Sequence, residues 1–115
     1  MVEQTIQVKT NGQYKSLDVG TLGNGNHIIV TKNFATSKRM EGVAKATGKP
    51  YLFWSAGVTY NGEKCTFAIN KEEQAKAFDE CGGVDDRIKV TLTKEILQNK
   101  KGIDYVKKTL SFALA

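Results

Sequence analysis

The alternation of apolar and polar residues is clearest around one Asn-Gly pair in the middle of the chain, Asn61-Gly62. Two runs rich in β-branched and aromatic residues flank this pair, over Pro50–Tyr60 and Glu63–Ile69. Asn and Gly tolerate the positive φ angles of a type I′ turn, so this pattern is the strongest short-range signal for a β-hairpin. We therefore predict a hairpin here and expect the rest of the chain to be arranged around it.

The two faces of this hairpin differ because side chains alternate along a strand. The face that suits the core carries Leu52, Trp54, Ala56, Val58, Tyr60, Cys65, Phe67 and Ile69. The other face carries Tyr51, Phe53, Ser55, Gly57, Thr59, Lys64 and Thr66. Exposed aromatic rings beside small residues and a lysine are typical of a surface on which bases stack. Burial of these rings under another segment is the alternative, and a one-residue bulge before Ser55 would exchange the two faces.

Further strands are predicted on both sides of the central hairpin. Residues 1–22 alternate around Asn11-Gly12 and predict a first hairpin, and a β-branched run predicts a buried strand over His27–Lys32. Residues 87–97 and 103–112 alternate as well, with Val106, Leu110 and Phe112 on the face expected to be buried. Lys108 interrupts that face, as at a strand end or a bulge.

Two segments break the strand pattern. Residues 32–49 fit neither a strand nor a long helix, so we predict a long basic loop, with a single helical turn in residues 38–46 as the alternative. After Ile69 the pattern changes to that of a short helix over residues 73–81. Asn70 is its predicted N-cap, Gly82 its terminator and Phe78 its buried side chain.

Composition limits the class of protein. A chain of 115 residues with one Pro and 40% hydrophobic residues predicts a single domain, 1–115, with a small core. It contains no apolar run long enough to span a bilayer and begins with no signal peptide, so we expect a soluble protein of the cytoplasm. Cys65 and Cys81 are expected to remain reduced, and with the single His27 they do not supply a four-ligand zinc site.

The net charge of +5 is unevenly distributed. Residues 32–49 carry +4 and residues 87–108 carry +5, whereas residues 63–86 carry −4. Two separated basic segments are the electrostatic signature of a polyanionic partner, although a basic surface can also serve solubility alone.

The order of these elements resembles the OB-fold proteins that bind single-stranded DNA, including small phage-encoded ones. The resemblance covers residues 26–112 and rests on element order, on GKPY at residues 48–51, on DRIKVTL at residues 86–92 and on NKKG at residues 99–102. It implies a mainly β, five-stranded Greek-key barrel with one short helix between its third and fourth strands. Its strands would be His27–Lys32, Pro50–Tyr60, Glu63–Ile69, 87–97 and 103–112. The hairpin in residues 1–22 would be an extension that this barrel does not need.

The function expected from these features is sequence-tolerant binding of single-stranded DNA in replication or recombination, in the host cytoplasm if the protein is encoded by a phage. In an OB-fold, oligonucleotides bind across the second and third strands and the loops beside them. The expected nucleic-acid contacts are Lys32, Phe34, Lys38, Arg39, Lys45, Lys49, Tyr51, Phe53, Lys64, Lys89, Lys100, Lys101, Tyr105 and Lys107. An RNA-binding OB module and a protein-interaction module that docks an acidic partner remain the alternatives.

An enzyme is not expected, and neither is a cofactor or a metal. Catalytic motifs such as Gly-x-Ser-x-Gly and His-Glu-x-x-His do not occur, and His27 lies within an apolar run. The apolar C-terminal strand and the N-terminal hairpin predict a homo-oligomer, first of all a dimer, with replication or recombination proteins as further partners. The alternative is that Phe112 and Leu114 pack on the core of their own protomer.

Overall fold

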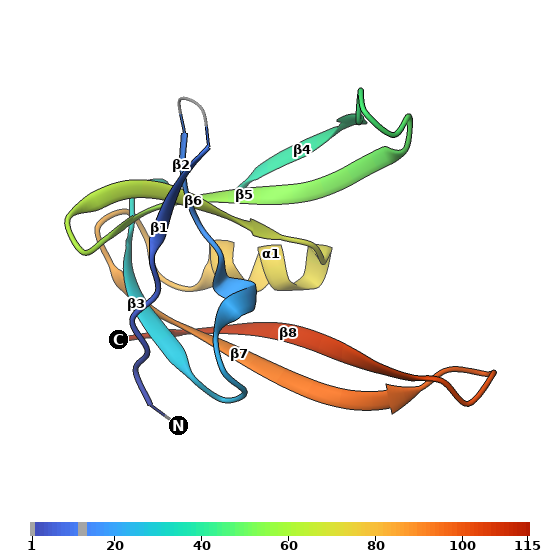
Figure 1. The fold of residues 1–115 in the computed structure, drawn as a ribbon. Coiled ribbons are helices and arrows are strands. Elements are labelled where there is room, and N and C mark those ends of the chain that lie inside the picture. Colours follow the sequence, from blue (N-terminus) through green and yellow to red (C-terminus); the bar gives the residue numbers. More distant parts are fainter. Residues whose placement is uncertain (1, 12–13) are drawn as a thin grey trace.

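The computed structural model describes residues 2–11 and 14–115, which form an open eight-stranded sheet with one short α-helix (Figure 1). The elements in chain order are β1 (Val8–Asn11), β2 (Tyr14–Leu17), the 3-10 helix η1 (Val19–Thr21), β3 (His27–Lys32), β4 (Lys38–Val43), β5 (Pro50–Tyr60), β6 (Glu63–Ile69), α1 (Glu72–Glu80), β7 (Arg87–Gln98) and β8 (Asp104–Leu114). The strand order is β1-β2-β6-β5-β3-β7-β8, and β4 pairs with β5 beside this path. The predicted mainly β fold with one short helix is thus confirmed, whereas a closed barrel is not seen in the described residues.

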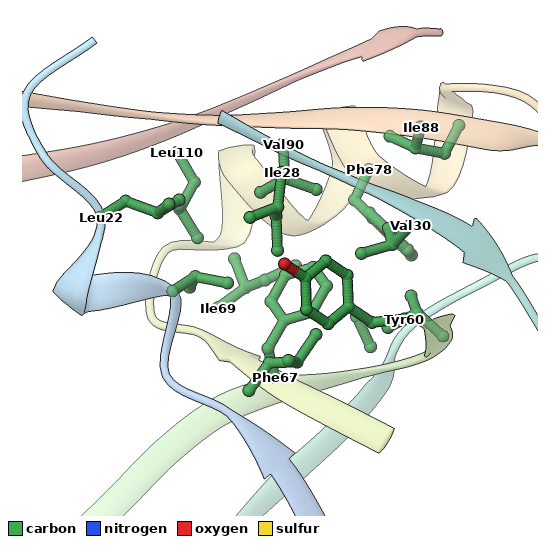
Figure 2. Packing of buried hydrophobic residues seen from close by; sticks show 14 of the residues in the cluster. Leu22, Ile28, Val30, Tyr60, Phe67, Ile69, Phe78, Ile88, Val90 and Leu110 are labelled. Atoms are coloured by element: carbon green, nitrogen blue, oxygen red, sulfur yellow. The ribbon is translucent and has the colours of Figure 1, made fainter. Parts of the chain in front are cut away.

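The central hairpin forms as predicted. Asn61 and Gly62 have φ angles of 50° and 80°, and β5 pairs with β6 from Trp54↔Ile69 to Tyr60↔Glu63. The predicted core face is correct over the paired part of both strands, and Figure 2 shows Tyr60, Phe67 and Ile69 in the core. Leu52 is an exception, because the first half of β5 extends beyond the core and leaves this side chain 44% exposed.

Residues 32–49 contain a strand, so the loop prediction is wrong for their central part. β4 pairs antiparallel with the first half of β5, from Lys38↔Ser55 to Val43↔Pro50. Its side chains are largely exposed, so the sequence lacks the apolar alternation by which half-buried strands are recognised. We call this two-stranded projection, β4 with the first half of β5, the first arm.

The hairpin of β7 and β8 forms a second, longer projection. Its register runs without interruption from Ile88↔Leu114 to Gln98↔Asp104, so Lys108 sits in regular strand and not at a bulge. Lys108 lies where the hairpin leaves the core, and its Nζ donates to the carbonyl of Gly20 at 3.2 Å. Val106, predicted to be buried, lies beyond this point and is 53% exposed. Figure 1 shows that the outer part of this hairpin, which we call the second arm, and the first arm project from the same side of the molecule.

Helix α1 closes the core with Phe78, as predicted. The Phe78 ring is fully buried and makes edge-to-face contacts with Phe67 and Phe112, at centroid distances of 5.7 and 5.2 Å. Gly82 follows the helix with a φ of 75°, as expected of a helix terminator. The N-cap position is Lys71, without a side-chain hydrogen bond, so the prediction of Asn70 as N-cap is wrong.

The N-terminal hairpin is part of the packed structure and not a dispensable extension. Ser16 of β2 bridges to Thr66 at the edge of β6, and Ile6 and Leu17 are buried in the common core. The Ile6 amide also donates to the Tyr60 hydroxyl at 3.2 Å. The predicted turn around Gly12 lies outside the described residues.

Candidate nucleic-acid interface

The outward face of β5 carries two neighbouring aromatic rings. The Tyr51 and Phe53 rings have centroids 5.9 Å apart and an interplanar angle of 34°. Tyr51 lies over Gly42 on β4, where an added Cβ would come within 2.7 Å of the Tyr51 hydroxyl oxygen. Tyr51 is 42% exposed and Phe53 is half-buried, so the first arm presents both rings on the face opposite the core.

A third ring is added by the loop between β3 and β4. The chain advances six residues from Lys32 to Lys38, while β5 advances three from Val58 to Ser55, so residues 33–37 loop out of the sheet. The Phe34 ring lies over Gly57, and its Cδ2 atom would be 2.6 Å from a Cβ at that position. Phe34 is nevertheless 65% exposed. The outer face of the sheet therefore carries Tyr51, Phe53 and Phe34 along β5, and we call it the aromatic face.

Three hollows on the aromatic face share lining residues. The first, of about 610 Å³, is lined by Lys15, Asn33, Phe34, Gly57, Lys64, Cys65, Thr66 and Asp85. The second, of about 550 Å³, is lined by Phe34, Ala35, Thr36, Ser37, Lys38, Ser55, Gly57 and Thr66. The third, of about 330 Å³, is lined by Lys9, Ser16, Leu17, Asp18, Phe53, Ser55, Thr66, Phe67 and Ala68. Thr66 lines all three, so the hollows are neighbours across β5 and β6.

Two of the predicted cations lie on this surface. Lys38 stands opposite Ser55, and Lys64 stands opposite Thr59, so both project from the aromatic face. The N-terminal hairpin adds Lys9 and Lys15 to the hollows, which the sequence prediction did not include. The apolar residues of that hairpin need to be buried, and this need could have indicated that the hairpin packs beside the sheet.

Two of these lysines lie close to carboxylates. Lys15 forms an ion pair with Glu63 at 3.4 Å, and Lys9 lies 4.0 Å from Asp18. All four groups are substantially exposed, so these pairs contribute little to stability and can be exchanged for phosphate contacts.

The remaining predicted cations of the first arm occupy other positions. Lys45 and Lys49 are exposed at its tip, in the turn between β4 and β5. Arg39 projects from the opposite face, beside Trp54, and forms an ion pair with Glu41 at 2.9 Å. Arg39 is therefore not brought to the aromatic face.

The β7–β8 hairpin carries the other predicted contacts on a separate surface. Lys100 and Lys101 are exposed in its terminal turn, where the Lys101 amide donates a hydrogen bond to the Asn99 side chain at 2.8 Å. Tyr105 and Lys107 stand on β8 opposite Leu97 and Glu95, and Lys89 is half-buried on β7. None of the three hollows on the aromatic face is lined by a residue of β7 or β8.

Lys32 does not belong to the interface, which corrects the sequence prediction. Its side chain is completely buried, and its Nζ donates to the Phe78 carbonyl at 2.9 Å. Three neighbouring carbonyls, at 3.3–3.4 Å from Nζ, share its other two N–H groups. It also lies 4.5 Å from the centroid of the Phe78 ring. A cation is favoured at the C-terminus of a helix, so Lys32 stabilises the end of α1. Burial lowers the pKa of Lys32, while the nearby carboxylates of Asp79 and Asp86 act in the opposite direction.

Comparison of the chain with protein-family models, curated proteins and solved structures yields no match. Within the described residues, no helix is long and apolar enough to cross a membrane. The same residues contain no cluster of three or more His, Cys, Asp or Glu side chains suited to a metal ion.

Proposed function

We propose that this protein binds single-stranded DNA with little sequence preference along the aromatic face. The observation that carries the proposal is the coincidence of three outward aromatic rings with neighbouring hollows bordered by lysines. Bases of any sequence have a flat face that stacks on aromatic rings, with about 1–3 kcal/mol per base. Lysines at the margin neutralise the phosphates. A duplex keeps its bases stacked inside, so this surface favours single strands.

The strand order supports an OB-fold as the finer description of the sheet. Counted from β3, the five strands of the barrel are β3, β5, β6, β7 and β8, and α1 lies between the third and the fourth. Their order in the sheet is then third, second, first, fourth, fifth. In an OB-fold, oligonucleotides bind on the face of strands 2 and 3, which here are β5 and β6 of the aromatic face. The first and second arms correspond to the two loops that flank that face.

A role in replication or recombination follows from sequence-tolerant binding of exposed single strands. RNA would bind through the same stacking and phosphate contacts, so the affinities for DNA and for RNA have to be compared directly. A labelled oligothymidine and an oligouridine of equal length are titrated with the protein at low salt. We expect binding of the DNA strand at micromolar protein or below. Absence of binding to either strand would contradict the proposal and favour an acidic protein partner.

Self-association through β8 forms part of the proposal. The N-terminal hairpin packs within its own protomer. The Phe112 ring packs against Phe67 and Phe78, as the alternative expected, whereas Leu114 is 62% exposed. β8 ends the sheet, and the Leu110 amide donates to the Gln74 side chain at 3.1 Å, so alternate residues direct their peptide groups to this edge.

The β8 edge of a second copy of the chain would fit this edge. Antiparallel pairing of two β8 strands about a two-fold axis at Val106 would place Lys108 opposite Asp104 of the other copy. It would also bring the two exposed Val106 side chains together. Opposite charges and apolar pairs across strands are favourable, so we propose a homodimer with this register.

A further inference from the structure

The Phe34 ring lines two neighbouring hollows of the aromatic face. We propose that Phe34 inserts between two successive bases, so that each face of its ring stacks on one base. The inference rests on the proposed function, since it specifies how a single strand occupies the aromatic face.

The Phe34 ring is oriented edge-on to β5. A Cβ at Gly57 would lie 2.6 Å from Cδ2 and 2.9 Å from Cε2 of Phe34, but 3.9 Å from Cγ. One edge of the ring is therefore directed at the strand, and the ring stands up from the sheet. With 65% of Phe34 exposed, both of its faces are left accessible to a flat ligand.

The two hollows beside Phe34 are lined by different lysines. Both are lined by Phe34, Gly57 and Thr66, but only the hollow of about 610 Å³ includes Lys64 and only that of about 550 Å³ includes Lys38. Phe34 thus stands at the shared border of two spaces, one lined by Lys15 and Lys64 and the other by Lys38. Each space can hold one base, and these lysines can contact phosphates on the two sides of the ring.

The loop that carries Phe34 is fixed at both ends. The Asn33 amide donates to the Gly57 carbonyl at 3.0 Å, and the Asn33 side chain accepts the Thr59 hydroxyl at 2.9 Å. At the other end, the Ser37 amide donates to the Asp79 carboxylate at 2.6 Å. A loop held before binding loses little conformational entropy when the strand arrives, so the position from which Phe34 projects is preorganised.

Glycine at position 57 is required by this arrangement. Any side chain there would collide with Phe34 and displace the ring, although the φ angle at Gly57 is not of the kind reserved for glycine. Gly57→Ala therefore moves the ring without removing it, whereas Phe34→Leu removes the flat ring and keeps an apolar side chain. Gly83→Ala is the matched control, since a Cβ at Gly83 meets no atom within 4 Å.

The test measures both affinity and base stacking. Oligothymidines containing two adjacent 2-aminopurines, moved stepwise along the strand, are titrated with the wild type and the three variants. Wild-type protein should abolish the exciton circular-dichroism couplet of the pair in at least one position, because the two bases are separated. Phe34→Leu and Gly57→Ala should preserve the couplet and bind more weakly by about 30-fold or more, the loss expected when the stacks on both faces of the ring are removed. Gly83→Ala should behave like the wild type.

The outcomes distinguish the inference from the proposed function. If the wild type binds the strand but preserves the couplet at every position, or if Phe34→Leu binds as tightly as the wild type, the insertion is wrong and the function stands. If the wild type binds no strand, both are wrong. Phe34 is exposed, so Phe34→Leu should remain folded and keeps the test decisive even if Gly57→Ala unfolds.

Discussion

The two arms project from the same side of the molecule but differ in what they present (Figure 1). The segment of the second arm has the larger net charge, +5 over residues 87–108. The segment of the first arm carries +4 over residues 32–49, and this value includes the buried Lys32. Only the first arm continues into a row of aromatic rings above a hollowed sheet. Charge alone attracts a polyanion, whereas stacking requires flat rings in a fixed position, so we assign different roles to the arms.

The largest loss of affinity is expected when the stacking surface is removed. Tyr51→Ala combined with Phe53→Ala should weaken binding of oligothymidine by about 100-fold or more, since each lost stack is worth about 1–3 kcal/mol. Both side chains face away from the core, so the thermal unfolding midpoint should change little. The matched control is Tyr105→Ala on the second arm, for which we expect a change of less than about threefold, because no stacking is assigned to that ring. An equal loss from Tyr105→Ala would remove the distinction between the arms.

The second effect separates the buried lysine from the exposed ones. Lys32→Met leaves four carbonyl groups at the end of α1 without their donor, so we expect a loss of about 2–3 kcal/mol in the free energy of unfolding. Lys38→Met, on the aromatic face, should leave stability within about 0.5 kcal/mol and weaken DNA binding instead. Urea unfolding and strand titration are measured on both. If Lys32→Met keeps its stability but loses affinity, Lys32 belongs to the interface after all.

The lowered pKa of Lys32 gives this variant a second signature. The folded state releases the Lys32 proton at a lower pH than the unfolded state, whose lysine keeps the ordinary pKa of 10.5. The folded state then binds fewer protons, so this group adds stability as the pH rises between the two values. Urea unfolding followed as the pH rises toward 10.5 should show this contribution in the wild type and not in Lys32→Met. Parallel pH profiles would contradict it.

The third effect concerns the lysines at the arm tips. Lys45→Ala with Lys49→Ala, and separately Lys100→Ala with Lys101→Ala, should each reduce the dependence of log K on log salt by about 0.7 for every phosphate that is no longer neutralised. The Tyr51 and Phe53 variants should leave that slope unchanged, because stacking releases no counterions. A tip variant with an unchanged slope would show that its arm does not reach the strand.

The fourth effect is on assembly, where light scattering should give twice the monomer mass of 12.7 kDa at micromolar concentration. Lys108→Asp should weaken the dimer because it places two carboxylates opposite each other in the proposed register. Combining Lys108→Asp with Asp104→Lys should restore it. A monomeric wild type would contradict the proposed homodimer.

The parts of the fold that could be predicted are those with a buried face. The central hairpin, β3 and the helix with Phe78 each bury one side, and this burial leaves a readable period in the sequence. β4 could not be recognised, because the first arm is exposed on both faces and no apolar alternation is required there. The same limit explains the error at Val106 on the second arm.

The candidate site was predictable in part, for a similar reason. The alternation along β5 placed Tyr51 and Phe53 correctly on the outward face. Phe34 reached its position over Gly57 through a shift of strand register, and Lys32 reached the end of α1 through a contact between residues 46 positions apart in the chain. Neither long-range arrangement leaves a local pattern.

The most direct test of the central claim compares single-stranded and duplex DNA of equal length over a range of salt concentrations. We predict that oligothymidine binds the wild type and that log K falls linearly with log salt, with a slope of about −0.7 for each phosphate neutralised. The aromatic face requires unpaired bases, so the duplex should bind much more weakly at every salt concentration. Equal affinity for the duplex, or an affinity for oligothymidine that does not change with salt, would contradict binding on the aromatic face.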